Sequence, residues 1–226
     1  MKTRLRLEGI YSPETIDHIE QRKILDLGFD FRPKSFNFLQ HYKFLELLEE
    51  KFSSSYKYWL HFENEHPDLI KKLLKDAKEV LAKKGFTENP FLLEFSDNQS
   101  LEYYDSFDQR FSWNYVDLES LEKVIQSKNL EVLIIPFTEI EHLHNTGRFQ
   151  EFVSMFHKKT FKAMHDNKIK LALKTDWDSD LFPSLFEYIN FDFCSIPVNG
   201  KIESSFRSID WVKFDSNLDY YQNLDF

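Results

Sequence analysis

Two patterns of apolar and polar positions alternate along most of this chain. Short apolar runs, typical of buried strands, are separated by stretches whose apolar residues recur every three or four positions, typical of helices with one buried face. The apolar runs lie at residues 3–9, 24–31, 56–62, 90–96, 111–116, 130–137, 169–175 and 191–197. Strands that alternate with helices predict βαβ units around a parallel sheet, and eight strands close a (β/α)8 barrel. We therefore predict an α/β fold in which residues 1–226 form a single TIM-barrel domain.

Several helices have recognisable starts in the sequence. Ser12 and Pro13 are the residue types preferred at an N-cap and at the first helical position. Pro67 opens a second helix, which we expect to reach residue 84 because its apolar positions keep a spacing of three and four. A further helix follows the sixth strand and starts near Phe149.

Helical patterns are weakest in two segments. Residues 98–110, where the fourth helix belongs, predict an irregular region. The tail after Lys201, polar and aromatic over residues 215–226, predicts a short or displaced final helix. We expect His142 and His144 to lie in a loop at the surface, because no partner pattern surrounds them.

The composition fits a globular protein and excludes some partners. Of 226 residues, 42% are hydrophobic and 24 are Phe, which is enough for one large core. The formal charge is −9 and Lys and Arg form no cluster, so we expect no nucleic-acid partner. Five Gly is a low number for a protein that cradles phosphate on backbone N–H groups.

Cysteine usage and hydropathy indicate a reducing compartment. Cys194 is the only cysteine, which excludes an internal disulfide and a cysteine-based zinc site. The first residues lack the apolar core of a signal peptide, and no apolar run reaches the roughly 18–20 residues that span a membrane. We expect a cytoplasmic protein with no membrane contact and no cofactor, and with Cys194 in the barrel wall; the oligomeric state stays open.

Residues 25–35 (LDLGFDFRPKS), read with residues 6–10 (RLEGI), resemble the start of phosphoribosylanthranilate isomerase, a (β/α)8-barrel enzyme of tryptophan biosynthesis. In that family the first strand ends in a Lys-Ile-Cys-Gly-Ile pattern, and the second reads Leu-Gly-Phe-x-Phe-x-Pro-Lys-Ser-Pro-Arg. Weaker similarities follow in the same order along the chain, at residues 58–67, 171–181 and 191–195.

The resemblance implies an Amadori rearrangement, which needs a general base and a general acid on opposite sides of the sugar skeleton. It places the base, a Cys in the family, at Glu8. It places the acid, an Asp in the family, at Pro136 and Phe137, neither of which donates a proton. The Arg that holds the anthranilate carboxylate becomes Asn37. The resemblance therefore implies a divergent member whose catalytic motifs are largely missing.

The phosphate site of the family is altered as well. Family members hold phosphate with Gly-Gly after the seventh strand and Ser-Gly after the eighth. Here the matching residues are Lys174 and Thr175, followed by Asp176, and Ser195 and Ile196. Side chains replace the glycines, and Asp176 adds negative charge that Lys174 offsets in part. The resemblance thus implies a weakened or lost phosphate site.

Glu8 is our candidate catalytic residue. Arg6, in the place of a family Lys, has the same strand parity, so both side chains point into the barrel. Glu8 lies at the C-terminal strand end, where TIM-barrel active sites lie. The alternative is a buried ion pair with no catalytic role, in which loss of Glu8 leaves Arg6 unpaired. The candidate ligand-binding residues are Arg6, Lys34, Glu94 (in the place of a family His), Lys174 and Asp176.

Other chemistry-bearing residues have plainer readings. Carboxylates at Glu94, Asp97, Asp176 and Asp178 fall near the same rim, and clustered carboxylates bind divalent cations. Loop acids are more often solvated, so we expect no metal site. Three tryptophans, at positions 59, 113 and 177, either form a stacking pocket or fill a glycine-poor barrel, and we prefer the second.

Three functions fit these observations. The first is a divergent barrel that lacks the parent isomerase activity and binds or transforms a small polar ligand at the C-terminal mouth. The second is a genuine phosphoribosylanthranilate isomerase with Glu8 as base. The third is a non-catalytic interaction protein, which an exposed apolar patch would favour.

Overall fold

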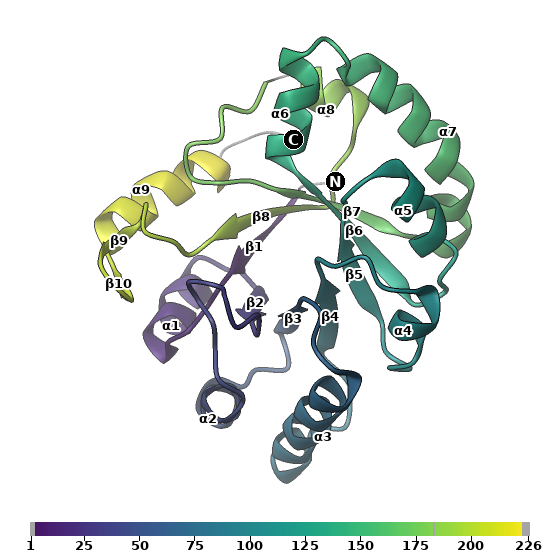
Figure 1. Cartoon of the computed structure of the whole chain (residues 1–226). Helices are drawn as coiled ribbons and strands as arrows, with labels where there is room; N and C mark the ends of the chain where they lie inside the picture. Colours follow the sequence, from purple (N-terminus) through teal and green to yellow (C-terminus); the bar gives the residue numbers. More distant parts are fainter. Residues whose placement is uncertain (1–2, 183, 223–226) are drawn as a thin grey trace.

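Eight parallel strands close into a barrel at the centre of the molecule (Figure 1). The computed structural model describes residues 3–182 and 184–222. Each strand pairs with the next along the chain, and the last pairs with the first to close the ring. The strands are β1 (Arg4–Glu8), β2 (Asp26–Asp30), β3 (Lys57–Phe62), β4 (Phe91–Phe95), β5 (Phe111–Asn114), β6 (Leu130–Pro136), β7 (Lys170–Lys174) and β8 (Phe193–Pro197). All eight apolar runs form strands, and the predicted TIM barrel is confirmed.

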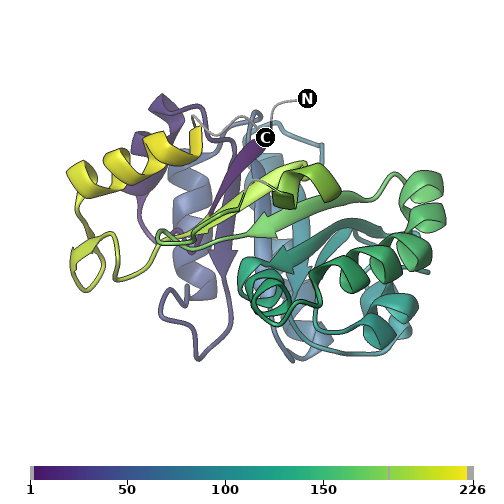
Figure 2. The same cartoon turned by 90° about the horizontal axis from the view of Figure 1, so that it is seen from above.

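Helices surround the barrel (Figures 1 and 2). They are α1 (Pro13–Gln21), α2 (His41–Lys51), α3 (Pro67–Lys83), α4 (Leu101–Asp105), α5 (Leu118–Val124), α6 (Phe137–Asn145), α7 (Phe149–Asn167), α8 (Ser184–Tyr188) and α9 (Trp211–Gln222). The predicted cap of α1 is confirmed, since Ser12 Oγ accepts a hydrogen bond from the Thr15 N–H and Pro13 takes the first position. The predicted starts of α3 and α7 are also confirmed.

Side-chain alternation along the strands divides the apolar residues between two layers. One set faces inward and fills the barrel, and consists of Trp59, Leu92, Val132, Ile134, Ala172 and Phe193. The opposite set, which includes Leu7, Leu27 and Leu60, belongs to the larger core under the helices. Trp59 is fully buried, so it fills the barrel as preferred from the sequence.

Gly28 on β2 lets the first two strands and an inward side chain come close together. A Cβ placed on Gly28 would lie 3.0 Å from the Glu8 Cα, 3.1 Å from the Leu7 carbonyl oxygen and 3.2 Å from Nη2 of Arg6. Two of these three neighbours are backbone atoms, which cannot turn aside. Glycine, the smallest residue, is therefore needed at this position beside Arg6 and Glu8.

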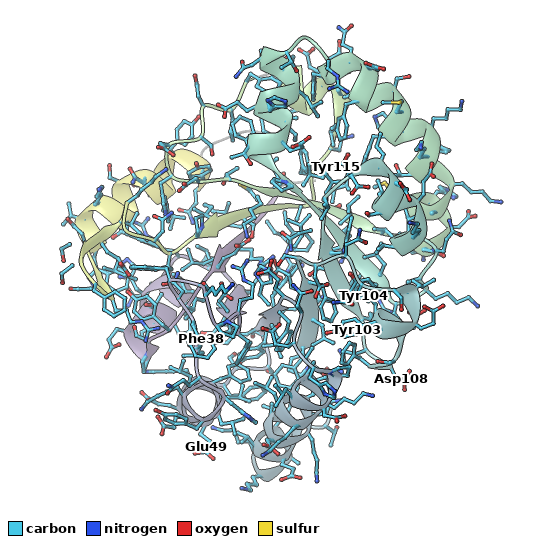
Figure 3. The ribbon with its side chains drawn as sticks, viewed as in Figure 1. Phe38, Glu49, Tyr103, Tyr104, Asp108 and Tyr115 are labelled. Atoms are coloured by element: carbon cyan, nitrogen blue, oxygen red, sulfur yellow. The ribbon has the colours of Figure 1, made fainter. Side chains whose placement is uncertain are left out.

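The segments with weak helical patterns are partly as predicted. The irregularity of residues 98–110 is confirmed, because α4 has only five residues. Tyr103 and Tyr104 tie α4 to the barrel (Figure 3): the Tyr103 hydroxyl donates to the Glu65 carbonyl at 2.7 Å and the Tyr104 hydroxyl to the Asp97 carbonyl at 2.9 Å.

Two expectations about local structure are wrong. His142 and His144 lie on α6 rather than in a loop, and both side chains remain at the surface.

Of the two alternatives for the final helix, short or displaced, the first is also wrong. The helix has twelve residues and follows a hairpin of β9 (Glu203–Ser205) and β10 (Ser208–Ile209). Residues 223–226 of the predicted tail lie outside the described residues. Among the helices of the described chain, none is long and apolar enough to cross a membrane.

Gly28→Ala should destabilise the protein by about 1–3 kcal/mol, because the added methyl group meets backbone atoms at 3.0–3.1 Å. Urea denaturation measures the change in the free energy of unfolding. Gly200→Ala is the matched control, since a Cβ there meets nothing within 4 Å. Equal stability of the two variants would contradict the close-approach argument.

Candidate functional site

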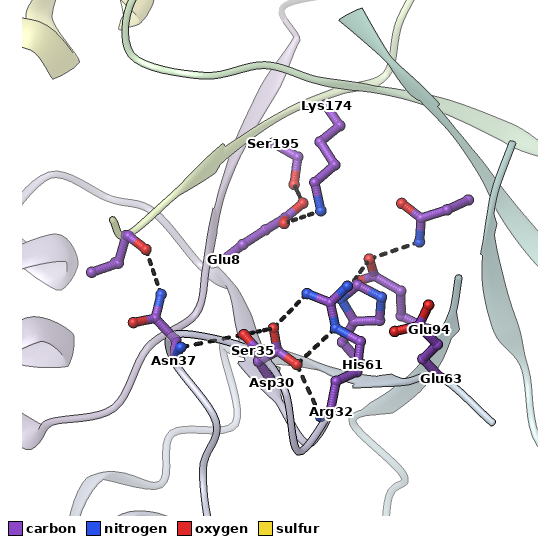
Figure 4. A network of polar contacts seen from close by, with 12 residues as sticks. Glu8, Asp30, Arg32, Ser35, Asn37, His61, Glu63, Glu94, Lys174 and Ser195 are labelled. Carbon is purple, nitrogen blue, oxygen red and sulfur yellow. Dashed lines mark hydrogen bonds and ion pairs between the residues drawn. The ribbon is translucent and has the colours of Figure 1, made fainter. Parts of the chain in front are cut away.

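Polar side chains gather at the C-terminal ends of the barrel strands. Residues two apart on a strand share the inward face. The inward polar residues near this end, here called the mouth cluster, are Arg6, Glu8, Asp30, His61, Glu94, Asn114, Lys174 and Ser195. Figure 4 shows most of these side chains pointing toward one another from different strands. At the corresponding end of β6 stands Pro136, which has no polar side chain to contribute.

An ion pair between Arg6 on β1 and Glu94 on β4 lies at the centre of the mouth cluster. Nη2 of Arg6 contacts Oε2 of Glu94, and the two side chains are 1% and 0% exposed. The guanidinium also lies 4.2 Å from the centroid of the Trp59 ring and 3.7 Å from Oε1 of Glu8. Arg6 therefore has Glu94 as its closest acidic partner, and the expectation that it depends on Glu8 alone is wrong.

Glu8 is held as a carboxylate by two other neighbours. Lys174 Nζ donates to Oε2 of Glu8 at 2.6 Å, and the Ser195 hydroxyl donates to Oε1 at 2.6 Å. Burial would raise the pKa of Glu8, but the charges of Lys174 and Arg6 outweigh it and lower the pKa from 4.5 to about 2. Glu8 is thus ionised at neutral pH, and it binds a proton weakly.

Glu94 has two further neighbours. Asn114 Nδ2 donates to its Oε1 at 3.0 Å, and Nδ1 of His61 lies 3.4 Å from the same oxygen. Burial lowers the pKa of His61 well below 6.5, and the nearby charges of Arg32 and Lys174 lower it further. The imidazole is therefore neutral, and its Nε2 is buried without a hydrogen-bond partner among the described residues.

Asp30 organises the loop that follows β2. Its two carboxylate oxygens accept hydrogen bonds from Nε and Nη2 of Arg32 at 2.9 and 2.6 Å, and from the Ser35 hydroxyl at 2.6 Å. Burial opposes the charge, but the bonds from Arg32 outweigh it, so the pKa of Asp30 is lowered. This loop is fixed beside the mouth by a two-point ion pair between residues only two positions apart.

Two of the candidate ligand-binding residues lie apart from the mouth cluster. Lys34 is exposed and makes no hydrogen bond or ion pair within the described part of the chain. Asp176 accepts hydrogen bonds from Nδ2 of Asn199 at 2.9 Å and from Nζ of Lys201 at 2.7 Å, in the loop after β8. The structure thus brings together Arg6, Glu8, Glu94 and Lys174 but not Lys34 or Asp176.

Sequence reasoning missed part of this arrangement. Asp30, His61 and Asn114 were not selected, although each lies near the C-terminal end of a predicted strand. The signal was present for His61, which lies two residues after the inward Trp59 and so shares its face. Arg32 had no such signal, because its position depends on the fold of the loop.

The remaining residues of interest lie in the barrel wall or under the helices. No group of three or more potential metal ligands is found among the described residues. Trp113 and Trp177 are buried, and their Nε1 atoms donate to the carbonyls of Asp97 and Pro197. Cys194 is buried in the wall, where burial raises the pKa of its thiol to about 12.

Comparison with known proteins identifies the fold. No protein-family model and no curated protein matches the sequence. Phosphoribosylanthranilate isomerase from Thermotoga maritima aligns with a TM-score of 0.64 at 12% identity, over 99% of this chain and 100% of that chain. The enzyme from Pyrococcus furiosus aligns with a TM-score of 0.62 at 11% identity, over 99% and 100%.

A second group of barrels also matches. An HpcH/HpaI aldolase from Desulfitobacterium hafniense aligns with a TM-score of 0.57 at 7% identity, over 99% of this chain and 94% of that chain. At such identities the matches establish a common fold, and a fold hosts many functions. The chain is thus a barrel similar to phosphoribosylanthranilate isomerases, as the sequence resemblance indicated.

Glu94→Gln should destabilise the protein by about 3–5 kcal/mol, because it leaves the buried Arg6 without its closest charge partner. Glu8→Gln should cost less, since Arg6 keeps Glu94. Urea denaturation of both variants measures the difference. Arg6→Met combined with Glu94→Leu should recover much of the loss by removing both charges. A Glu8→Gln variant less stable than Glu94→Gln would contradict this ranking.

Stability should fall as the pH drops from about 4.5 to about 2, in part through Glu8. A lowered pKa in the folded state stabilises the fold above the unfolded pKa, and protonation removes this contribution, on the order of 3 kcal/mol. The free energy of unfolding, measured by denaturation at each pH, should depend less steeply on pH for Glu8→Gln than for the wild type. Glu49→Gln, exposed on α2 (Figure 3), is the control and should keep the wild-type slope. Equal slopes for Glu8→Gln and the wild type would refute the assignment.

Proposed function

We propose that this protein is a phosphoribosylanthranilate isomerase-like barrel that lacks the parent isomerase activity and binds a small polar ligand at the C-terminal mouth. The observation that carries the proposal is the mouth cluster, in which polar side chains of several strands converge where TIM barrels bind their ligands. A cytoplasmic location is part of the proposal. It fits a buried single cysteine with a raised thiol pKa.

Loss of the isomerisation is supported by the residues opposite Glu8. Pro136 ends β6 and Phe137 begins α6 in the place where the family has its acid, and Phe137 is 2% exposed. Neither side chain transfers a proton. Asn37, in the place of the carboxylate-binding Arg, is buried and donates to the Val198 carbonyl. These positions now serve the fold.

The hydrogen bonds between the seventh and eighth βα loops also weigh against a phosphorylated substrate. TIM barrels commonly bind phosphate with these loops. Here the carboxylate of Asp176 accepts hydrogen bonds from the Asn199 amide, the Lys201 ammonium and the Trp177 N–H. An internal carboxylate thus takes up the donors that an anion would need.

The two alternatives have weaker support. A general base works best with a pKa near the operating pH, and Glu8, with a pKa of about 2, is far below it. This weighs against a genuine isomerase with Glu8 as base. Exposed apolar residues such as Leu69, Phe161 and Val212 stand on three different helices, α3, α7 and α9. Scattered residues of this kind are normal on a monomer surface and favour no interaction face.

Expression of this protein should not restore growth of a tryptophan auxotroph that lacks phosphoribosylanthranilate isomerase. Loss of one acid–base partner alone commonly lowers the rate by about 10²–10⁴. Growth without tryptophan at normal expression is the measurement. A functional isomerase gene in the same vector is the positive control, and immunodetection confirms that both proteins accumulate. Growth restored by expression of this protein would contradict the proposed loss of activity.

A further inference from the structure

We infer that the mouth binds an uncharged, hydroxyl-bearing small molecule, with one hydroxyl group donating to Nε2 of His61. The inference rests on the proposed function and adds to it the chemical class of the ligand and the residue that selects it. It differs from the phosphorylated, anionic substrate class that the fold resemblance suggests.

The free atom of His61 is an acceptor, and Nε and Nη1 of Arg6 in the same cluster are buried donors without a partner among the described residues. His61 is 4% exposed, and its Nδ1 faces Oε1 of Glu94 at 3.4 Å. An ionised carboxylate only accepts hydrogen bonds, so the tautomer that suits this contact carries its proton on Nδ1. Nε2 then presents a lone pair, and it has no partner among the described residues. A buried acceptor without a partner costs free energy, which a donor from a ligand would recover.

The donor is better supplied by a neutral group than by a charged one. Around His61 the carboxylates of Glu8, Asp30 and Glu94 are matched by the cations of Arg6, Arg32 and Lys174, three against three. A ligand phosphate or carboxylate would find each cation already paired. It would have to displace an internal carboxylate, whereas a hydroxyl group needs no change in the charge pairs.

Two long, partly exposed side chains lie near His61 at the mouth. Figure 4 shows Arg32 beside the His61 ring, with Lys174 and Glu8 across the mouth. The side chains of Arg32 and Lys174 are 26% and 27% exposed, so both reach solvent at the mouth. Rotamer changes of exposed side chains take picoseconds to nanoseconds.

The test uses the full chain labelled with ¹⁵N in its histidine rings. Long-range ¹H–¹⁵N spectra distinguish Nδ1 from Nε2 and report hydrogen bonding at each. Glycerol, ribose and myo-inositol are the neutral probes, with inorganic phosphate and ribose 5-phosphate as charged probes. We expect at least one neutral probe to shift the Nε2 resonance of His61 saturably, and the charged probes to leave it in place.

His61→Asn is the matched variant, because an Asn amide can still donate toward Glu94 but has no atom in the place of Nε2. It should bind the neutral probe about tenfold more weakly or worse in calorimetry. His165→Asn is the control, since His165 is exposed on α7 and should leave the affinity unchanged. Melting temperatures of both variants verify that they are folded; if His61→Asn does not fold, the Nε2 resonance of the wild type decides alone.

Three outcomes would overturn the inference. A shift of Nε2 by phosphate and not by neutral probes would reverse the ligand class while leaving the mouth as a binding site. An Nε2 resonance that no probe moves would mean that an enclosed water molecule satisfies it. Undiminished binding by folded His61→Asn would place the ligand elsewhere. Each is distinct from failure of the proposed loss of isomerase activity, which only the growth assay reports.

Discussion

The buried pair of Arg6 and Glu94 is the constraint on which the rest of the mouth depends. Two charges removed from water must be paired closely, because an isolated buried ion costs several kcal/mol. The two side chains are 1% and 0% exposed. The pair joins β1 to β4, which are separated in the barrel by β2 and β3. Gly28 makes room for the guanidinium, and the Trp59 ring lies against it. Its neighbours must therefore fit an arrangement that cannot change without loss of stability.

The chemistry of the mouth follows from this constraint. Since Arg6 is paired with Glu94, Glu8 takes Lys174 as its nearest cation and remains ionised. His61 lies between these charges and stays neutral. The outcome is a set of matched charges in which Nε2 of His61 and Nε and Nη1 of Arg6 lack hydrogen-bond partners among the described residues. Acid–base catalysis, by contrast, needs groups whose pKa values lie near the working pH. The fold does not fix these properties, because TIM barrels host many different sites.

Internal hydrogen bonds also connect the loops after β7 and β8. Asp176, Asn199 and Lys201 bond to one another where barrels of this fold commonly hold phosphate. Asn37 bonds to the Val198 carbonyl. These side chains stabilise the loops, because a donor inside a folded protein needs an acceptor.

The sequence by itself determined the barrel and the inward direction of the first site residues. Strands and helices depend on local patterns, so the spacing of apolar residues was sufficient to predict the positions of all eight strands. Because Arg6 and Glu8 are two positions apart on one strand, the sequence also predicted that both side chains point into the barrel. Tertiary structure alone decided the partners. Arg6 and Glu94 are 88 positions apart, and Glu8 and Lys174 are 166 apart. Which cation meets which carboxylate depends on the register of the closed sheet and on loop conformation, and both are set by packing across the whole chain.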